Sequence, residues 1–369
     1  MTRMDMISRK NHHSINFSVA VNCVPTRPLG HGTFGDVHEF CFNSKDSNAY
    51  VAVKRIKGVF YSSIHLRRAI RELRVMNHLH GHPNIVSLLD VDLVESGYYP
   101  GLYCYIELMD ADLSTIIRDR EEILTEWHFL TISYQLLQAL HYIHSANVVH
   151  RDLKPGNILV SRQGIIKICD FGLARAIIGQ DYDREKYTSY ITTRWYRAPE
   201  ILLKVDSYHY GIDMWAAGVI IGEVSTRRAM FCGRSSADQL LKISGVLGSP
   251  PESWLQQYNV KVAWTKLNLP SRLVASTTLR ELLPAGSSVH LLDLLCRILV
   301  YNPTARLTAL QALQHPFFSP IYDPMETRTC ATPINTNFED APGEYLRSIL
   351  LDDVNFVRKS RRSMPEPGQ

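Results

Sequence analysis

The chain has 369 residues, 45% of them apolar, which is enough for one large or two ordinary domains with a full hydrophobic core. Its net charge of +4, from 40 basic and 36 acidic residues, is too small and too evenly spread to indicate nucleic-acid binding. Seven widely spaced cysteines without a CxxC or Cys/His cluster argue against disulfides and zinc, and neither a signal peptide nor a membrane-spanning apolar run is evident. We therefore expect a reduced, intracellular and soluble protein.

The first part of the chain, from about Phe17 to Ile56, alternates short β-rich runs with turn residues. The runs are FSVAVNCV, LGHGTFGDVHEFCF and AYVAVKRI, and we predict that they form strands of one antiparallel sheet. Between His65 and Leu79, apolar residues recur at helical spacing while arginines fill the other faces. This pattern predicts an amphipathic helix.

The middle and the end of the chain have different patterns. After a strand pair ending in GLYCYIELM, the chain changes to a helical lobe, and the first long helix is indicated by an apolar stripe of Phe129, Ile132, Leu136, Leu140 and Ile143. Beyond Pro320 the periodicity fades into a loop-like stretch, followed by a short predicted helix from Glu344 to Val357. The tail RKSRRSMPEPGQ, from about residue 358, is predicted to be disordered.

A glycine-rich loop is the first candidate for chemistry: Gly30-His31-Gly32-Thr33-Phe34-Gly35-Asp36-Val37. Its GxGxxGxV pattern lets backbone N–H groups approach triphosphate oxygens. An ordinary hairpin turn explains such a motif about as often, and a dinucleotide-binding fold is a further alternative. The latter needs a helix directly after the glycines, whereas VHEFCF alternates as a strand does. We predict that the loop joins two strands.

A lysine in the strand that follows is the second candidate. Period-two alternation in YVAVKRI puts Ala52 and Lys54 on one face, with Val51 and Val53 on the other. Lys54 can then face a nucleotide across a small residue, although a strand lysine is more often a solvated edge residue. Glu72, on the predicted helix, is a carboxylate that could hold its ammonium group.

The most specific signal is His150-Arg151-Asp152-Leu153-Lys154-Pro155-Gly156-Asn157, followed thirteen residues after Asn157 by Asp170-Phe171-Gly172. Phosphoryl transfer needs a carboxylate near the attacking hydroxyl, a cation on the transferring group and oxygen ligands for magnesium. Asp152, Lys154, Asn157 and Asp170 supply these groups. A solvated polar loop would not explain why they recur in order with the glycine loop and Lys54.

With these motifs in view, the chain resembles a eukaryotic protein kinase from about Val24 to Phe318. Further marks of that family are Ala198-Pro199-Glu200, Asp213-Met214-Trp215-Ala216-Ala217-Gly218, and Arg306 as the partner of Glu200. The resemblance implies an α+β bilobal fold with ATP in the cleft and a structural role for His150. It implies a β-rich N-lobe at 24–109 and a helical C-lobe at 110–318, between an N-terminal extension (1–23) and a C-terminal extension (319–369) with a docking segment.

Within that family, TRWYRAPE and Thr188-Ser189-Tyr190 resemble the mitogen-activated protein kinases, and Arg194 separates them from the cyclin-dependent type. Ser189 departs from the usual Glu, Gly or Pro, which puts the upstream activator in doubt. Several segments are most similar to fungal members, including the sporulation-specific type of budding yeasts. The resemblance implies proline-directed transfer to Ser or Thr, switched on by phosphorylation of Thr188 and Tyr190.

The same resemblance assigns roles to residues along the chain. For ATP they are Leu29, Val37, Ala52 and Leu159 around the base, Ile106 as gatekeeper, Glu107 and Met109 at the hinge, and Asp112, with Cys169 lining the back of the pocket. Thr193 should brace Asp152 and Lys154. Phosphate on Thr188 should be bound by Arg68, Arg71, Arg151 and Arg175, and phosphate on Tyr190 by Arg194 and Arg197. Asp323 and Glu326 match an acidic docking segment, which Thr327 and Arg328 weaken; solvated turn carboxylates are the alternative.

The expected partners are ATP, magnesium, proteins with Ser/Thr-Pro sites, an upstream activating kinase, phosphatases and docking-motif partners. We expect a monomer of the cytoplasm and nucleus that binds neither nucleic acid nor membranes. Two alternatives stay open: a pseudokinase scaffold, since a fold alone does not imply catalysis, and a cyclin-activated kinase. Lys54, Asp152, Asn157 and Asp170 are all present, which favours an enzyme.

Overall fold

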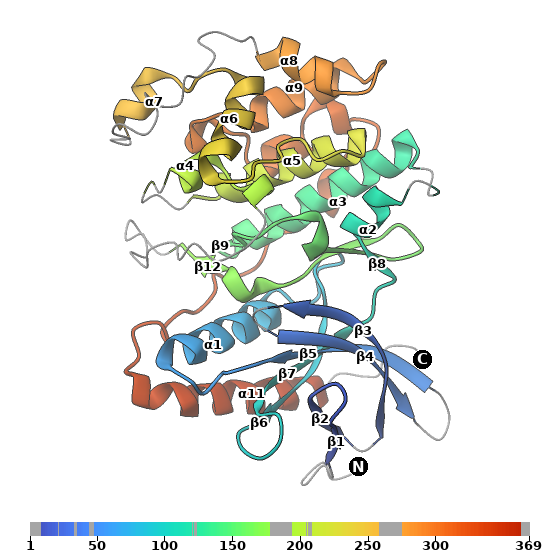
Figure 1. The fold of residues 1–369 in the computed structure, drawn as a ribbon, viewed down its shortest axis with the longest axis vertical. Coiled ribbons are helices and arrows are strands. Elements are labelled where there is room, and N and C mark those ends of the chain that lie inside the picture. Colours follow the sequence, from blue (N-terminus) through green and yellow to red (C-terminus); the bar gives the residue numbers. More distant parts are fainter. Residues whose placement is uncertain are drawn as a thin grey trace.

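The computed structural model describes residues 9–20, 22–32, 35–43, 48–119, 121, 124–177, 194–203, 205, 209–257 and 275–362. A sheet lobe and a helical lobe are stacked along the long axis (Figure 1), which confirms the predicted α+β bilobal arrangement. In the described parts of the chain, no helix is both long and apolar enough to cross a membrane. All seven cysteines are free thiols.

The sheet lobe is built on one five-stranded antiparallel sheet. Its β3–β4 pairing continues to the pair Gly32 and Gly35, so the glycine-rich loop joins two strands as predicted. Gly35 is required by close packing, because a Cβ atom there would lie 2.2 Å from the carbonyl oxygen of Arg55. The strands in spatial order are β3 (Cys23–Gly32), β4 (Gly35–Asn43), β5 (Asn48–Ile56), β7 (Gly101–Glu107) and β6 (Leu88–Val94).

The two faces of this sheet bury different cores. Ala52 belongs to the main core beneath α1 (Ser63–His78), whereas Val51 and Val53 face a second core on the outer side. That outer core is covered by a separate hairpin of β1 (Arg9–His12) and β2 (Phe17–Ala20). We had expected the run Phe17–Val24 to be one strand of the main sheet. Phe17–Ala20 instead form β2 of the hairpin, and only Cys23 and Val24 belong to β3 of the main sheet. A sequence pattern indicates a strand but not the strand with which it pairs, and β2 pairs with β1. Phe17 is fully buried in the outer core.

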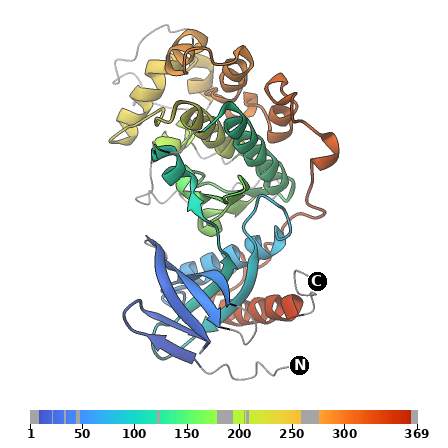
Figure 2. The same ribbon diagram turned by 90° about the vertical axis from the view of Figure 1, so that its right-hand side faces the viewer.

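The C-terminal helix α11 (Leu346–Arg362) returns to the sheet lobe and lies along α1 and β6 (Figures 1 and 2). It extends five residues beyond the predicted end at Val357, so disorder from residue 358 is wrong for 358–362. Tertiary contacts hold this last turn: Arg358 pairs with Asp92, and Arg361 donates to the Leu88 carbonyl at 3.0 Å. Residues 363–369 lie outside the described chain.

The helical lobe is built around two buried helices, α3 (Glu126–Ser145) and α5 (Gly211–Thr226). The predicted stripe of α3 is buried as expected, and α5 is buried along most of its length. The other helices are α2 (Leu113–Arg118), α4 (Pro199–Leu202), α6 (Ser236–Leu247), α7 (Glu252–Gln257), α8 (Ala275–Leu282), α9 (Val289–Ile298) and α10 (Ala309–Leu313). Two small sheets are formed by the short strands β8 (Ala111–Asp112), β9 (Val148–Val149), β10 (Ile158–Val160), β11 (Ile166–Ile168) and β12 (Arg175–Ala176).

Candidate active site

Lys54 joins the two lobes through a pair of carboxylates. Its ammonium group pairs with Glu72 on α1 and lies 2.7 Å from Asp170 Oδ1. Because α1 belongs to the sheet lobe and Asp170 follows β11 of the helical lobe, one cation fixes the relative position of both. The backbone of Asp170 is left-handed, with φ of 64°, a conformation uncommon outside glycine and typical of functional loops.

The charges of this cluster are stable at neutral pH. Burial works against the ammonium of Lys54, but Asp170 and Glu72 outweigh it and raise its pKa above the ordinary value. Burial likewise opposes ionisation of Asp170, yet Lys54 holds the pKa of that carboxyl below its ordinary range. Beside them, burial raises the pKa of the Cys169 thiol to about 12, which leaves it protonated and unreactive.

The catalytic loop presents Asp152, Lys154 and Asn157 together. Lys154 Nζ lies 2.7 Å from Asp152 Oδ2, and Asn157 Nδ2 donates to the Asp152 carbonyl at 2.8 Å and to Oδ2 at 3.2 Å. The turn Pro155–Asn157 brings these three side chains onto one side of the loop. The Asp152 carboxylate is thus oriented from two sides, with a cation beside it that can contact an incoming phosphoryl group.

A buried aspartate on α5 holds the loop in shape. Asp213 accepts the backbone N–H of His150 at 2.8 Å and that of Arg151 at 2.9 Å. Arg151 has a φ of 71°, so this unfavourable backbone is stabilised directly by the carboxylate. His150 is fully buried, and its Nε2 lies 3.0 Å from the Cys169 carbonyl, one residue before Asp170. His150 therefore has a structural position.

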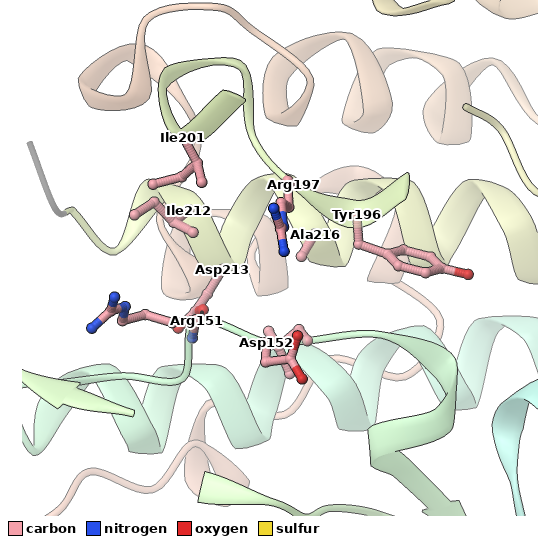
Figure 3. Close-up of a pocket in the computed structure, with 9 residues that line it drawn as sticks. Arg151, Asp152, Tyr196, Arg197, Ile201, Ile212, Asp213 and Ala216 are labelled. Carbon is pink, nitrogen blue, oxygen red and sulfur yellow. Dashed lines mark hydrogen bonds between the residues drawn. The ribbon is translucent and has the colours of Figure 1, made fainter. Parts of the chain in front are cut away.

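A small pocket opens next to Asp152, between the catalytic loop and the segment that follows residue 193. Figure 3 shows Arg151 and Asp152 on one side and Tyr196 and Arg197 on the other. Tyr196 also donates its hydroxyl to Glu223 Oε2 on α5 at 2.7 Å. A substrate hydroxyl that approaches Asp152 would thus lie beside the 194–197 segment.

Several residues predicted to line the ATP site are neighbours in the sheets or lie close to the glycine loop. Ala52 pairs with Ile106 across β5 and β7, so the small residue and the gatekeeper are direct neighbours. Leu159 on β10 pairs with Asp112 on β8, which brings those two residues to the floor of the cleft. Leu29 and Val37 lie in β3 and β4 close to the glycine loop, and Met109 lies two residues after the end of β7.

Three residues of the predicted ATP site, Glu107, Asp112 and Asp36, have side-chain partners that the sequence did not indicate. Glu107 accepts the Ser87 N–H at 2.6 Å and pairs with Lys167 on β11 at 3.0 Å, so the hinge is tied to both lobes. Asp112 caps α2 by accepting from Thr115. In the glycine loop, Asp36 pairs with Lys57 and lies 2.5 Å from His31. Thr33 and Phe34 lie outside the described residues.

The donor set fits a magnesium ion that is bound mainly by substrate. Asp170 uses one carboxylate oxygen on Lys54, which leaves the other, and the Asn157 amide nitrogen faces Asp152, which leaves its carbonyl oxygen. Magnesium is commonly held by one or two protein oxygens together with phosphate oxygens and water. Asn157 and Asp170 are suited to that role.

Comparison with known proteins extends the motifs to the whole chain. The protein kinase domain model matches residues 24–318. The chain is 40% identical to mitogen-activated protein kinase MPS1 of Pyricularia oryzae, over 99% of this chain and 88% of that protein. It is 39% identical to the sporulation-specific mitogen-activated protein kinase SMK1 of Saccharomyces cerevisiae, over 89% of this chain and 87% of that protein.

The chain belongs to the mitogen-activated protein kinase family. It is therefore a protein serine/threonine kinase that uses ATP, with protein substrates and an upstream kinase. This family membership favours the enzyme over the pseudokinase scaffold and the cyclin-activated type.

In this MAP kinase, the arginines expected to bind phosphate already have local partners. Arg71 makes a bidentate ion pair with Glu339, at 2.5 and 2.6 Å. Arg68 lies beside Glu72 and Gly172, since a Cβ atom at Gly172 would be 3.0 Å from its guanidinium. The Arg175 guanidinium donates to the Ala174 carbonyl at 3.0 Å, while its backbone pairs with Val149 in the β9–β12 ladder.

The remaining residues of the predicted switch lie at or beyond the edge of the described chain. Arg194 belongs to a short 3-10 turn, η3 (Arg194–Tyr196), and Arg197 directly follows it. Thr188, Tyr190 and Thr193 lie outside the described residues.

The C-terminal extension of this MAP kinase holds α1 in place, which the sequence did not reveal. Arg67 donates to the Glu339 and Ala341 carbonyls, at 3.0 and 2.7 Å. Arg74 forms a bidentate pair with Asp353 on α11, at 2.7 and 3.0 Å. Because Glu72 lies on the same helix, these contacts stabilise the position that pairs it with Lys54. The partners are more than 250 residues apart, so no local pattern could have indicated them.

The predicted docking residues lie on the surface of the helical lobe. Asp323 caps the turn Pro324–Glu326 by accepting the Met325 N–H at 2.8 Å, and its own N–H donates to the Tyr134 hydroxyl. Asp323 and Glu326 are both exposed. The geometry thus suits a capped turn and leaves both carboxylates accessible.

Proposed function

We propose that this MAP kinase transfers the γ-phosphate of magnesium-bound ATP to a Ser or Thr hydroxyl that precedes proline. The observation that carries the proposal is the assembled cluster of Lys54 with Glu72 and Asp170, next to Asp152 oriented by Lys154. These ion pairs supply the cations and carboxylates that the proposed transfer needs.

In the proposed reaction, the substrate oxygen forms a bond to the γ-phosphorus while the bond to the β-phosphate oxygen breaks and ADP leaves. Asp152 orients the hydroxyl and accepts its proton, while Lys154 offsets charge on the transferring group. Lys54 holds the phosphates of ATP, and Glu72 keeps its ammonium in line. Magnesium, held by Asn157 and Asp170, would neutralise phosphate charge.

The preference for proline rests on the sequence Thr193-Arg194-Trp195-Tyr196-Arg197, of which Tyr196 and Arg197 line the pocket beside Asp152. Proline has no backbone N–H, so a pocket without an acceptor at that point disfavours other residues by leaving their N–H unsatisfied. A degenerate peptide library should show enrichment of proline directly after the phosphorylated residue. No enrichment there would refute the preference.

The switch is proposed to be phosphorylation of Thr188 and Tyr190. Each phosphate adds about −1.5 to −2 charge and three strong acceptors, so it can bind an arginine cluster. For Thr188 the cluster is Arg68, Arg71, Arg151 and Arg175, and for Tyr190 it is Arg194 and Arg197. Since Arg71 is paired with Glu339, capture of the phosphate must displace that carboxylate.

The Thr188→Ala and Tyr190→Phe variants should each lose most activity, as measured by phosphate transfer after treatment with an activating kinase. Mass spectrometry provides the second arm, because active enzyme should carry both phosphates. Active enzyme without either phosphate, together with fully active variants, would refute the switch.

Docking of partners with basic motifs is proposed at Asp323 and Glu326. Both are exposed, so charge reversal should raise the KM for such partners, most strongly at low salt where surface charge is least screened. Peptides without a basic motif serve as the control and should be unaffected. An unchanged KM for every partner with a basic motif would refute the docking role and leave Asp323 and Glu326 as residues of a capped turn.

The setting proposed for the enzyme is the cytoplasm and nucleus, as a monomer that acts on proteins and binds neither nucleic acid nor membranes. Phosphatases are the expected partners that reverse the switch. The name of the yeast relative supports a role in sporulation. A deletion strain of the source organism that still forms normal spores would contradict that role.

A further inference from the structure

A glutamine on α6 supports the segment that borders the active site. Gln239 is fully buried, and its side-chain amide makes three hydrogen bonds. Its Nε2 donates to the Trp195 carbonyl at 3.1 Å and to the Phe231 carbonyl at 3.2 Å, while its Oε1 accepts the Gly233 N–H at 2.8 Å. Both amide protons and an acceptor site are therefore used.

The chain before α6 is shaped around this side chain. A Cβ atom at Gly233 would lie 2.4 to 2.6 Å from the backbone and Oε1 of Gln239, so only glycine permits the approach. The Phe231 ring is buried and stacks on Trp215 of α5, with ring centroids 6.3 Å apart. The Gln239 amide is thus anchored to two rigid neighbours, and its contact with Trp195 cannot shift freely.

Trp195 is the central residue of η3. Two buried side chains hold this turn in place, because Gln239 binds Trp195 and Glu223 binds the next residue, Tyr196. Gln239 binds the carbonyl of Trp195, and Glu223 accepts the hydroxyl of Tyr196 at 2.7 Å. Trp195 contacts Gln239, and the next two residues, Tyr196 and Arg197, line the pocket of Figure 3 together with Asp152. Gln239 can therefore affect the substrate site through residues 195–197.

We infer that Gln239 is a positioning residue that sets selectivity for the substrate residue after the phosphorylated Ser or Thr. This inference rests on the proposed preference for proline. By binding the Trp195 carbonyl toward α6, Gln239 keeps that acceptor away from the substrate. A residue with a backbone N–H then finds no partner, whereas proline needs none. Without the Gln239 donor, the peptide plane of Trp195 can rotate and offer its carbonyl to a non-proline substrate.

The test compares three peptides that differ only after the target serine: proline, alanine and N-methylalanine, which lacks the N–H without having a ring. Gln239→Met keeps length and volume, but it has no donor for the Trp195 carbonyl. Ser244→Ala is the matched control, because Ser244 is also fully buried on α6 and its hydroxyl donates to the Leu240 carbonyl at 2.6 Å, so the substitution likewise removes a buried donor from this helix. All proteins are full-length, and mass spectrometry confirms equal phosphorylation.

In wild type, kcat/KM should be high for proline and N-methylalanine and low for alanine. In Gln239→Met the ratio of proline to alanine, and that of N-methylalanine to alanine, should each fall about fivefold, the scale of one net hydrogen bond. Ser244→Ala should keep both ratios.

A folded Gln239→Met with unchanged ratios, or with an equal loss on all three peptides, would overturn the inference. Should Gln239→Met fail to fold, Gln239→Leu, which also lacks a donor, is tested by the same two ratios. Wild type that does not distinguish proline from alanine would instead refute the proposed preference, and with it the role of Gln239.

Discussion

Arg306 is the residue whose replacement should be least tolerated outside the active site. Its guanidinium and the Glu200 carboxylate are both completely inaccessible (0%) and form a bidentate pair at 2.7 Å. The other donors reach the carbonyls of Val300, Gly211 and Tyr301 at 2.7 to 3.0 Å, so every N–H of the guanidinium is satisfied.

The Arg306→Lys substitution keeps the charge but removes the planar fork, so Glu200 and part of the carbonyl set lose their donors. Breaking a buried pair of this kind costs about 3 to 5 kcal/mol, and the retained charge places the expected loss near about 3 kcal/mol. A typical domain has only about 5 to 15 kcal/mol of stability. The variant should therefore lie close to unfolding at physiological temperature.

Urea denaturation followed by tryptophan fluorescence measures this loss, because the Trp215 ring is 5.0 Å from the guanidinium. Arg297→Lys is the matched control: Arg297 pairs with Asp293 on the surface, with side chains 59% and 46% exposed, and should change stability by less than about 1 kcal/mol. Equal midpoints for the two variants would refute the buried-pair argument.

Two further predictions concern pH and the switch. Burial lowers the pKa of His82 to about 4, so the folded protein excludes a proton that the unfolded chain accepts below its ordinary value of 6.5; stability should fall by about 2 kcal/mol between pH 7 and pH 5. His82→Asn keeps an acceptor for the Asn84 N–H, and its urea midpoint should fall less with acid; parallel pH profiles would contradict this. Glu339→Gln should destabilise the unphosphorylated enzyme by about 1 to 2 kcal/mol, because Arg71 loses a partly buried charge partner. Phosphorylation of Thr188 should reduce that loss, and an equal loss in both forms would argue against capture by Arg71.

The sequence predicted those parts of the fold that depend on local periodicity. Alternation in AYVAVKRI placed Ala52 and Lys54 correctly, because successive strand residues face opposite sides. The same pattern could not say which sheet a strand joins, and the run at Phe17 pairs with β1 instead of the main sheet. The last turn of α11 depends on Asp92, 266 residues away from Arg358, so composition alone predicted disorder there.

In the candidate site, too, the sequence predicted what is close along the chain and missed contacts between distant residues. Asp152, Lys154 and Asn157 lie within six residues, so their spacing already implied one loop. The sequence offered Glu72 as a partner for Lys54, but it did not indicate the contact of Lys54 with Asp170, which is 116 residues away. Glu339 and Gln239 had no signal of their own, because a lone carboxylate or amide has meaning only through the residue it contacts.

Phosphate transfer by wild type and by Asp152→Asn, measured with radiolabelled ATP on a Ser-Pro peptide, tests the assigned catalytic role most directly. Asp110→Asn is the control, since Asp110 is an exposed carboxylate paired with Arg162 outside the catalytic loop. The Asp152 variant should lose activity by at least about a hundredfold, because its carboxylate serves the hydroxyl, while its affinity for ATP stays nearly unchanged. Undiminished transfer by Asp152→Asn would contradict the mechanism, as would a loss explained wholly by weaker ATP binding.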